Sequence, residues 1–177
     1  MAVGETRPGY EVWRPNREKA TSQTTRFVMA LLLLATGGVC LLVTIGGWKL
    51  LEGGAGMGIV CAIFVILYVL FAVRVLAWSR GVLPVAAAVS ILLLIFAAVG
   101  AGSWFSRDKS GLATALLPDA LLGTLLLLLI PLCVVVIAVA MIAFNQDWHV
   151  EEERPIGRGE DYGAEPPPPD REAPQPA

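Results

Sequence analysis

Hydrophobic residues collect in four long blocks along this chain, separated by glycine, proline and charged residues. The blocks span residues 27–47, 57–78, 82–104 and 120–144. Each holds about 20 residues or more, and a helix of that length crosses the ~30 Å hydrocarbon core of a bilayer. A helix buried in a soluble core usually keeps a polar face, whereas these blocks have almost none. The pattern predicts an all-α, polytopic membrane protein whose four transmembrane helices form an up-down bundle.

Two hydrophilic segments flank the predicted transmembrane domain of residues 27–144. Residues 1–26 form an N-terminal leader, and residues 145–177 form an acidic tail rich in proline. The first block follows this leader and exceeds the about 7–15 apolar residues of a signal peptide, so we expect it to remain in the protein. The tail lacks apolar periodicity, which predicts disorder.

The distribution of basic residues predicts the orientation in the membrane. Four spans place both termini on one side, which collects nine Lys and Arg against three on the other side. The nine are Arg7, Arg14, Arg17, Lys19, Arg26, Arg74, Arg80, Arg154 and Arg158, and the three are Lys49, Arg107 and Lys109. Because positive loops stay in the cytoplasm, we expect an inner-membrane protein with both termini cytoplasmic. On that side, Glu151–Glu153 would be repelled by anionic headgroups or would meet the basic leader.

Arg74 is the one charged residue well inside a hydrophobic block, and its neighbours suggest a role at the membrane interface. It precedes Trp78 by four residues and Arg80 by six. This places it about 6 Å below the headgroups, within reach of a long side chain that snorkels. The alternative is a buried partner or a ligand for Arg74. Four tryptophans, at positions 48, 78, 104 and 148, lie close to the span ends, as expected of an interfacial aromatic belt.

Small residues at four-residue spacing indicate where the spans pack closely. Lipid tails are as apolar as leucine, so helices in membranes associate through close backbone approach. The predicted packing positions are Gly54, Gly58, Ala62, Ala86 and Ser90. Contact within one chain and contact with another subunit both remain open. Within the last block, Pro131 removes a backbone donor and predicts a kink.

Reactive chemistry is sparse in this sequence. The central parts of the four blocks carry no Asp, Glu, Lys or His, which argues against an ion-coupled carrier. Cys40, Cys61 and Cys133 all fall in apolar blocks, where we interpret them as packing residues and not as disulfides or metal ligands. We therefore expect no enzyme, no cofactor, no metal site and no nucleic-acid partner.

These observations favour a non-catalytic membrane protein, an accessory or scaffold subunit packed against a larger membrane complex. The lipid bilayer and other membrane subunits are the expected partners, and a homo-oligomer is possible. One alternative is a small oligomeric transporter or channel, which would require Thr36, Thr44, Ser90 and Thr124 to converge on a pore. Another is an enzyme acting on lipids, for which the candidates are Arg80, Asn145, Asp147 and His149.

Overall fold

A computed structural model describes residues 10–48, 50–51, 55–106, 108, 110 and 115–155 of the chain. These residues belong to two units, one formed by residues 15–150 and the other by the two terminal segments. The first unit contains a short helix, α1 (Pro15–Glu18), and four long ones. The long helices are α2 (Ala20–Gly47), α3 (Ala55–Leu76), α4 (Val82–Ser106) and α5 (Asp119–Phe144).

Four helices long and apolar enough to cross a membrane are thus confirmed, at the positions that the sequence predicted. The largest difference is at the start of α2, which begins at Ala20 and not near residue 27. Residues 21–26 are all polar, so the hydrophobic pattern could not include this segment, yet none of them is a helix breaker. The helix therefore extends about two turns beyond its apolar part.

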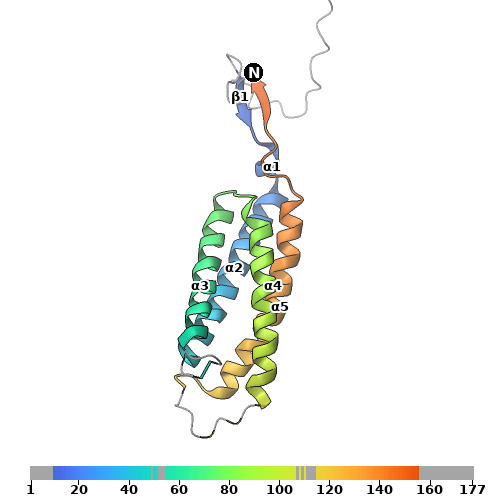
Figure 1. Ribbon diagram of the computed structural model, residues 1–177. Coiled ribbons are helices and arrows are strands. Elements are labelled where there is room, and N and C mark those ends of the chain that lie inside the picture. Colours follow the sequence, from blue (N-terminus) through green and yellow to red (C-terminus); the bar gives the residue numbers. More distant parts are fainter. Residues whose placement is uncertain are drawn as a thin grey trace, which may run out of the picture. The chain divides into compact units, whose positions relative to one another are not determined.

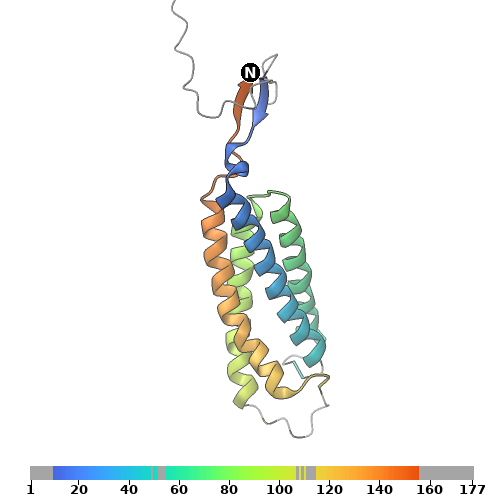
Figure 2. The same ribbon diagram turned by 180° about the vertical axis from the view of Figure 1, so that it is seen from behind.

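The long helices pack side by side, as Figures 1 and 2 show. Helix α4 packs most extensively against α5, and α2 packs against both α3 and α5. Helices α3 and α4 meet least among these neighbouring pairs. The helical unit is therefore tight around α2 and α5 and looser between α3 and α4.

Hydrogen bonds between helix termini define the two ends of this unit. The start of α2 lies beside the end of α3, because Arg26 donates to the Leu76 carbonyl, and the region after α3 binds the end of α5. We call this the arginine end. At the opposite end, the amide of Leu116 donates to the carbonyl of Gly46, and the indole of Trp104 donates to the carbonyl of Asp119. We call this the cavity end, for a cavity described below.

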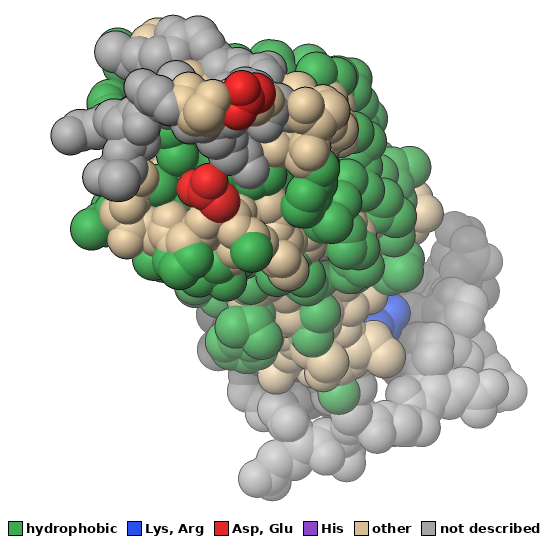
Figure 3. All heavy atoms as spheres, turned by 90° about the horizontal axis from the view of Figure 1, so that it is seen from below, with side chains coloured by type: hydrophobic (Ala, Val, Ile, Leu, Met, Phe, Trp, Pro, Cys, Tyr) green, Lys and Arg blue, Asp and Glu red, His purple; other side chains and the backbone are tan. Residues whose placement is uncertain are grey.

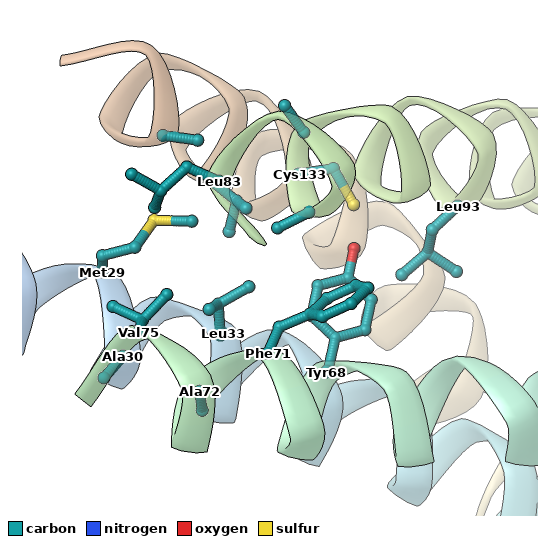
Figure 4. Close-up of a cluster of buried hydrophobic side chains, with 14 of the residues drawn as sticks. Met29, Ala30, Leu33, Tyr68, Phe71, Ala72, Val75, Leu83, Leu93 and Cys133 are labelled. Carbon is teal, nitrogen blue, oxygen red and sulfur yellow. The ribbon is translucent and has the colours of Figure 1, made fainter. Parts of the chain in front are cut away.

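The interior between the helices is a hydrophobic core with one buried side-chain hydrogen bond of note. Figure 4 shows Met29, Leu33, Val75 and Leu83 facing one another in this core, and each is fully buried. In the same view, the hydroxyl of Tyr68 points toward the thiol of Cys133. That hydroxyl lies 2.8 Å from the Ser90 hydroxyl, which itself donates to the Ala86 carbonyl.

The outer surface of the helices is as apolar as their interior. Large hydrophobic side chains are exposed on every long helix, and Figure 3 shows them covering the visible flank of the unit. Examples are Leu31, Ile66, Val99 and Ile142, each more than half exposed. A soluble monomer rarely exposes so large a contiguous apolar surface. Such a surface is compatible with an integral membrane protein whose helices cross a lipid bilayer.

Helix α5 passes through Pro131 without ending. Figures 1 and 2 show its first, yellow part tilted away from the remaining, orange part. A proline inside a helix removes one backbone hydrogen bond and its ring pushes against the preceding turn, so it is the local feature able to bend the helix.

The terminal segments form a small sheet, so residues 152–155 are a β-strand within the tail for which the sequence predicted disorder. Strand β1 (Tyr10–Trp13) pairs antiparallel with β2 (Glu152–Pro155), with Val12 opposite Glu153. The pairing is supported by ion pairs that composition alone cannot reveal. Arg14 Nη2 lies 2.5 Å from a Glu151 carboxylate oxygen, and Arg154 Nε lies 2.6 Å from Glu11. Glu151–Glu153 therefore meet the basic leader, which was one of the two expectations for them. The predictions for residues 1–9 and 156–177 lie outside the described residues.

Candidate functional site

The arginine end is built around Trp78, whose backbone adopts a left-handed conformation that is usually found at glycine. After α3, the amide of Ser79 donates to the carbonyl of Arg74 and the amide of Trp78 donates to that of Val75. This pair of bonds is the Schellman motif that ends many helices, with Trp78 at its left-handed position, φ 61°. A side chain other than glycine is strained there. The ring of Trp78 must therefore make contacts that offset this strain.

Those contacts come from three other parts of the helical unit. Trp148, fully buried after α5, packs its ring edge-to-face on Trp78 with 5.4 Å between centroids. The guanidinium of Arg26 in α2 lies 4.2 Å from the centroid of the Trp78 ring, and that of Arg17 in α1 lies 5.6 Å from it. Cation–π contacts of this kind are each favourable by about 0.5–2 kcal/mol, depending on exposure. We call these four residues the tryptophan–arginine cluster.

Arginine side chains at this end also donate to backbone carbonyls at the helix ends and just beyond them. Arg80 Nε donates to the Phe144 carbonyl at the end of α5 over 3.0 Å, and its Nη1 pairs with Asp147 at 2.5 Å. Arg17 donates to the Trp148 carbonyl at 3.1 Å, and Arg26 to Leu76 at 3.4 Å. The last carbonyls of a helix lack intrahelical donors and carry its negative dipole end, so a cation is favoured there.

Amide groups complete the polar layer around Trp148. Its indole donates to the side-chain oxygen of Gln146, whose side-chain nitrogen donates to the Thr25 hydroxyl on α2. Asn16 donates to the carbonyl of Asp147, which like Trp78 has a positive φ, 47°. The bond between Gln146 and Thr25 thereby joins the start of α2 to the region after α5, and Asn16 and Arg17 join α1 to the same region.

The three residues predicted for the membrane interface all lie at this end, in different surroundings. Arg74 is exposed, in the last turn of α3, so the prediction that it snorkels to the headgroups stays a prediction. Trp78 and Arg80 are half-buried and bind residues of the helical unit. Of the tryptophans assigned to an aromatic belt, Trp104 and Trp148 are 5% and 0% exposed. These two rings are packing residues of the core.

The predicted packing positions lie in several environments. A Cβ added at Gly58 would lie 2.7 Å from the Trp48 ring, so this glycine permits a close contact within the chain. Ala86 and Ser90 are fully buried, and Ala62 is half-buried. Gly54 lies outside the described residues. Gly37 belongs to the run of small residues in the first span, and an added Cβ there would lie 3.1 Å from the Cβ of Tyr68.

The hydroxyl groups proposed for a pore do not gather at one place. Thr36 and Thr44 are buried and donate to the carbonyls four residues earlier in α2, and Ser90 does the same in α4. Thr124 is exposed and donates to Ala120 in α5. Each hydroxyl is therefore satisfied by its own helix.

The candidate enzyme residues are likewise used by the fold or separated from one another. Arg80 and Asp147 form the ion pair described above, Asn145 ends α5, and His149 is exposed. Within the residues that the structure describes, no three His, Cys, Asp or Glu come close enough to hold a metal ion.

The helical unit also contains an apolar cavity of about 120 Å³ toward the cavity end. All four long helices contribute to its wall, for example through Cys40, Cys61, Ala97 and Leu129. The thiol of Cys40 contacts the carbonyl of Cys61 at 3.7 Å across the α2–α3 interface. The cavity therefore adjoins two of the three free cysteines.

Sequence reasoning missed the tryptophan–arginine cluster and the buried Tyr68. Arg17 and Arg26 were counted as topology signals, and nothing in their spacing indicated a contact with Trp78. A basic residue near each helix terminus is the available signal for carbonyl capping, but it does not identify the partner. Comparison of the chain with protein-family models, with curated proteins and with solved structures found no match.

Proposed function

We propose that this protein is a non-catalytic, four-span accessory subunit that seats against a larger protein of the same membrane. In this proposal the helices form an up-down bundle in the inner membrane, with the arginine end and both termini on the cytoplasmic side. The observation that carries the proposal is that Arg17, Arg26, Arg80 and the buried hydroxyl groups make their polar contacts inside the helical unit. None of the predicted reactive residues is gathered around a space where a substrate could react.

Helix α5 is the best candidate for the contact with that larger subunit. It is the least buried of the four spans, with 22% of its most apolar window inside the structure against 44% for α2. Its outward face presents large side chains such as Leu128 and Val135, seven residues apart and therefore on one stripe of the helix. A partner helix whose face carries small residues could pack closely against such a stripe.

A small oligomeric transporter is the alternative, and the hydroxyl groups argue against it. Thr36, Thr44 and Ser90 are buried inside one chain, so a second copy could not bring them to a shared pore. Their hydrogen bonds to their own helices are also the usual way in which Ser and Thr are satisfied in an apolar helix.

Purification of the full-length, tagged chain in a mild detergent tests the proposal. We expect stoichiometric co-purification of larger membrane subunits, and loss of that complex in Val135→Trp because the bulky ring disturbs the α5 face. Val69→Trp is the matched control, since Val69 of α3 is 45% exposed against 43% for Val135 and its substitution should leave the complex intact. A chain that purifies alone as a homo-oligomer and conducts solutes in liposomes would replace the proposal by the transporter alternative.

The proposed orientation has a separate test. Single cysteines introduced near each terminus, in a variant lacking the three native cysteines, should react with a membrane-impermeant maleimide only after the cytoplasmic face is opened. Labelling of the two termini from opposite sides would contradict both the orientation and an even number of spans.

A further inference from the structure

The cavity of the helical unit has walls made almost entirely of carbon and sulfur. Buried residues Leu93, Ala97 and Leu129 form its inner side, and each is less than 5% exposed. The polar groups in the wall already have partners. The Ser103 hydroxyl donates to the Gly100 carbonyl at 3.1 Å, and the Trp104 indole donates to Asp119 at 3.0 Å. Such a space offers nothing to fix a polar ligand, and apolar cavities of this kind stay dry.

The same cavity reaches the lipid-facing surface of the helices. Phe96 and Val99 line it from α4 and are 46% and 66% exposed, so they belong to both the wall and the outer surface. On the other side, Met57 and Cys61 of α3 line it and are half-buried. Because α3 and α4 are the most loosely packed neighbours, the way into the cavity lies between these two helices.

We propose that this cavity binds the end of a lipid acyl chain, which enters from the bilayer between α3 and α4. The chemistry of the walls selects a hydrocarbon, and the bilayer surrounds the opening with hydrocarbon chains. An empty apolar space forfeits the dispersion contacts that its lining atoms could make, and a chain end restores them. The size fits a chain end, since an engineered apolar cavity of about 150 Å³ admits benzene. This inference rests on the membrane location of the helices and not on the accessory role.

Photocrosslinking of the wild-type chain tests the site directly. The full chain is reconstituted into nanodiscs of phosphatidylcholine that carries a diazirine near the end of one acyl chain, and labelled residues are mapped by mass spectrometry after illumination. We expect labels on Leu93, Ala97 and Leu129, which bulk lipid cannot reach. Labels confined to exposed residues such as Ile63 and Ile95 would overturn the proposal, whether or not any partner subunit is found.

A pair of glycines two residues apart in α4 supplies a matched test by substitution. Gly100 lines the cavity, and an added Cβ there would meet only the end of the Leu126 side chain, at 4.0 Å. Gly102 has no atom within 4 Å of an added Cβ. Gly100→Leu should fill the cavity and lower labelling of the buried wall about tenfold, a loss of about 1.4 kcal/mol in binding. Gly102→Leu should leave the labelling unchanged.

Equal labelling of the buried wall in wild type and in folded Gly100→Leu would contradict the proposed site. Retention of helical circular dichroism and of a single elution peak shows that the variant is folded. If Gly100→Leu does not fold, the smaller Gly100→Val gives the same comparison, and the wild-type map decides the question without any substitution.

Discussion

At the arginine end, three guanidinium groups donate to backbone carbonyls, whereas at the cavity end the carbonyls accept from backbone amides and an indole. Arg17, Arg26 and Arg80 supply the first set of bonds, and Leu116 and Trp104 contribute to the second. The arginine end adds two aromatic rings packed edge-to-face, while the cavity end has an apolar cavity. Charged donors and aromatic packing therefore hold the arginine end together, whereas an apolar cavity lies toward the other end.

The largest expected effect comes from removing a buried ring at each end. Trp148→Ala should lower the free energy of unfolding by about 3–5 kcal/mol, the usual cost of truncating a fully buried tryptophan. Trp104→Ala should cost at least about 1 kcal/mol less, because Trp104 already borders a cavity and has fewer atoms to lose contact with. Unfolding of both variants in mixed micelles, followed by circular dichroism, measures the difference. Equal losses would show that the two ends are equally well packed.

The second largest effect is expected from substitution of Arg80, which measures how much this residue stabilises the contact between the start of α4 and the end of α5. Arg80→Met keeps the apolar stem and removes both the bond to the Phe144 carbonyl and the ion pair with Asp147. We expect the free energy of unfolding to fall by about 1–2 kcal/mol. The hydrogen bond from the charged guanidinium is strong, but solvent screens the ion pair because Asp147 is half exposed.

Arg80→Lys serves as the control for that substitution. Lysine retains the charge but lacks the planar guanidinium group, whose separate N–H donors reach the Phe144 carbonyl and the Asp147 carboxylate at the same time. The lysine variant should fall between wild type and Arg80→Met in the same unfolding measurement. Full stability of Arg80→Met would mean that the polar bonds of Arg80 contribute nothing to holding the arginine end together.

Trp78 allows backbone strain to be separated from ring contacts. Trp78→Ala removes the ring but keeps a side chain at a positive φ, whereas Trp78→Gly removes the ring and relieves the strain. Both variants should be less stable than wild type, and the alanine variant should be less stable than the glycine variant by about 1 kcal/mol. Thermal or detergent unfolding of the pair measures this gap. An alanine variant as stable as the glycine variant would show that the left-handed backbone at this position is not strained.

The sequence predicted the four spans well because hydrophobic block length depends on the bilayer and not on the partner of each residue. It could not predict the pairing of β1 with β2, since Glu11 and Arg154 are far apart in the chain and each looks like an ordinary solvated charge. The sequence also assigned Trp148 to the headgroup region, although its ring is buried in the core. A tryptophan at a span end has the same pattern whether its ring faces lipid or the core.

The smallest effect concerns the neutral hydrogen bond that lies between the two ends. Tyr68→Phe removes the bond to the Ser90 hydroxyl and leaves the ring in place, while Ser90 still donates to the Ala86 carbonyl. We expect the free energy of unfolding to fall by about 0.6 kcal/mol, which is the average contribution of such side-chain hydrogen bonds within membranes. Tyr10→Phe, at an exposed residue of β1, should have no effect in the same unfolding assay. A loss as large as that of Arg80→Met would contradict the view that charged bonds at the arginine end dominate the polar stabilisation, because a single neutral pair would then match them.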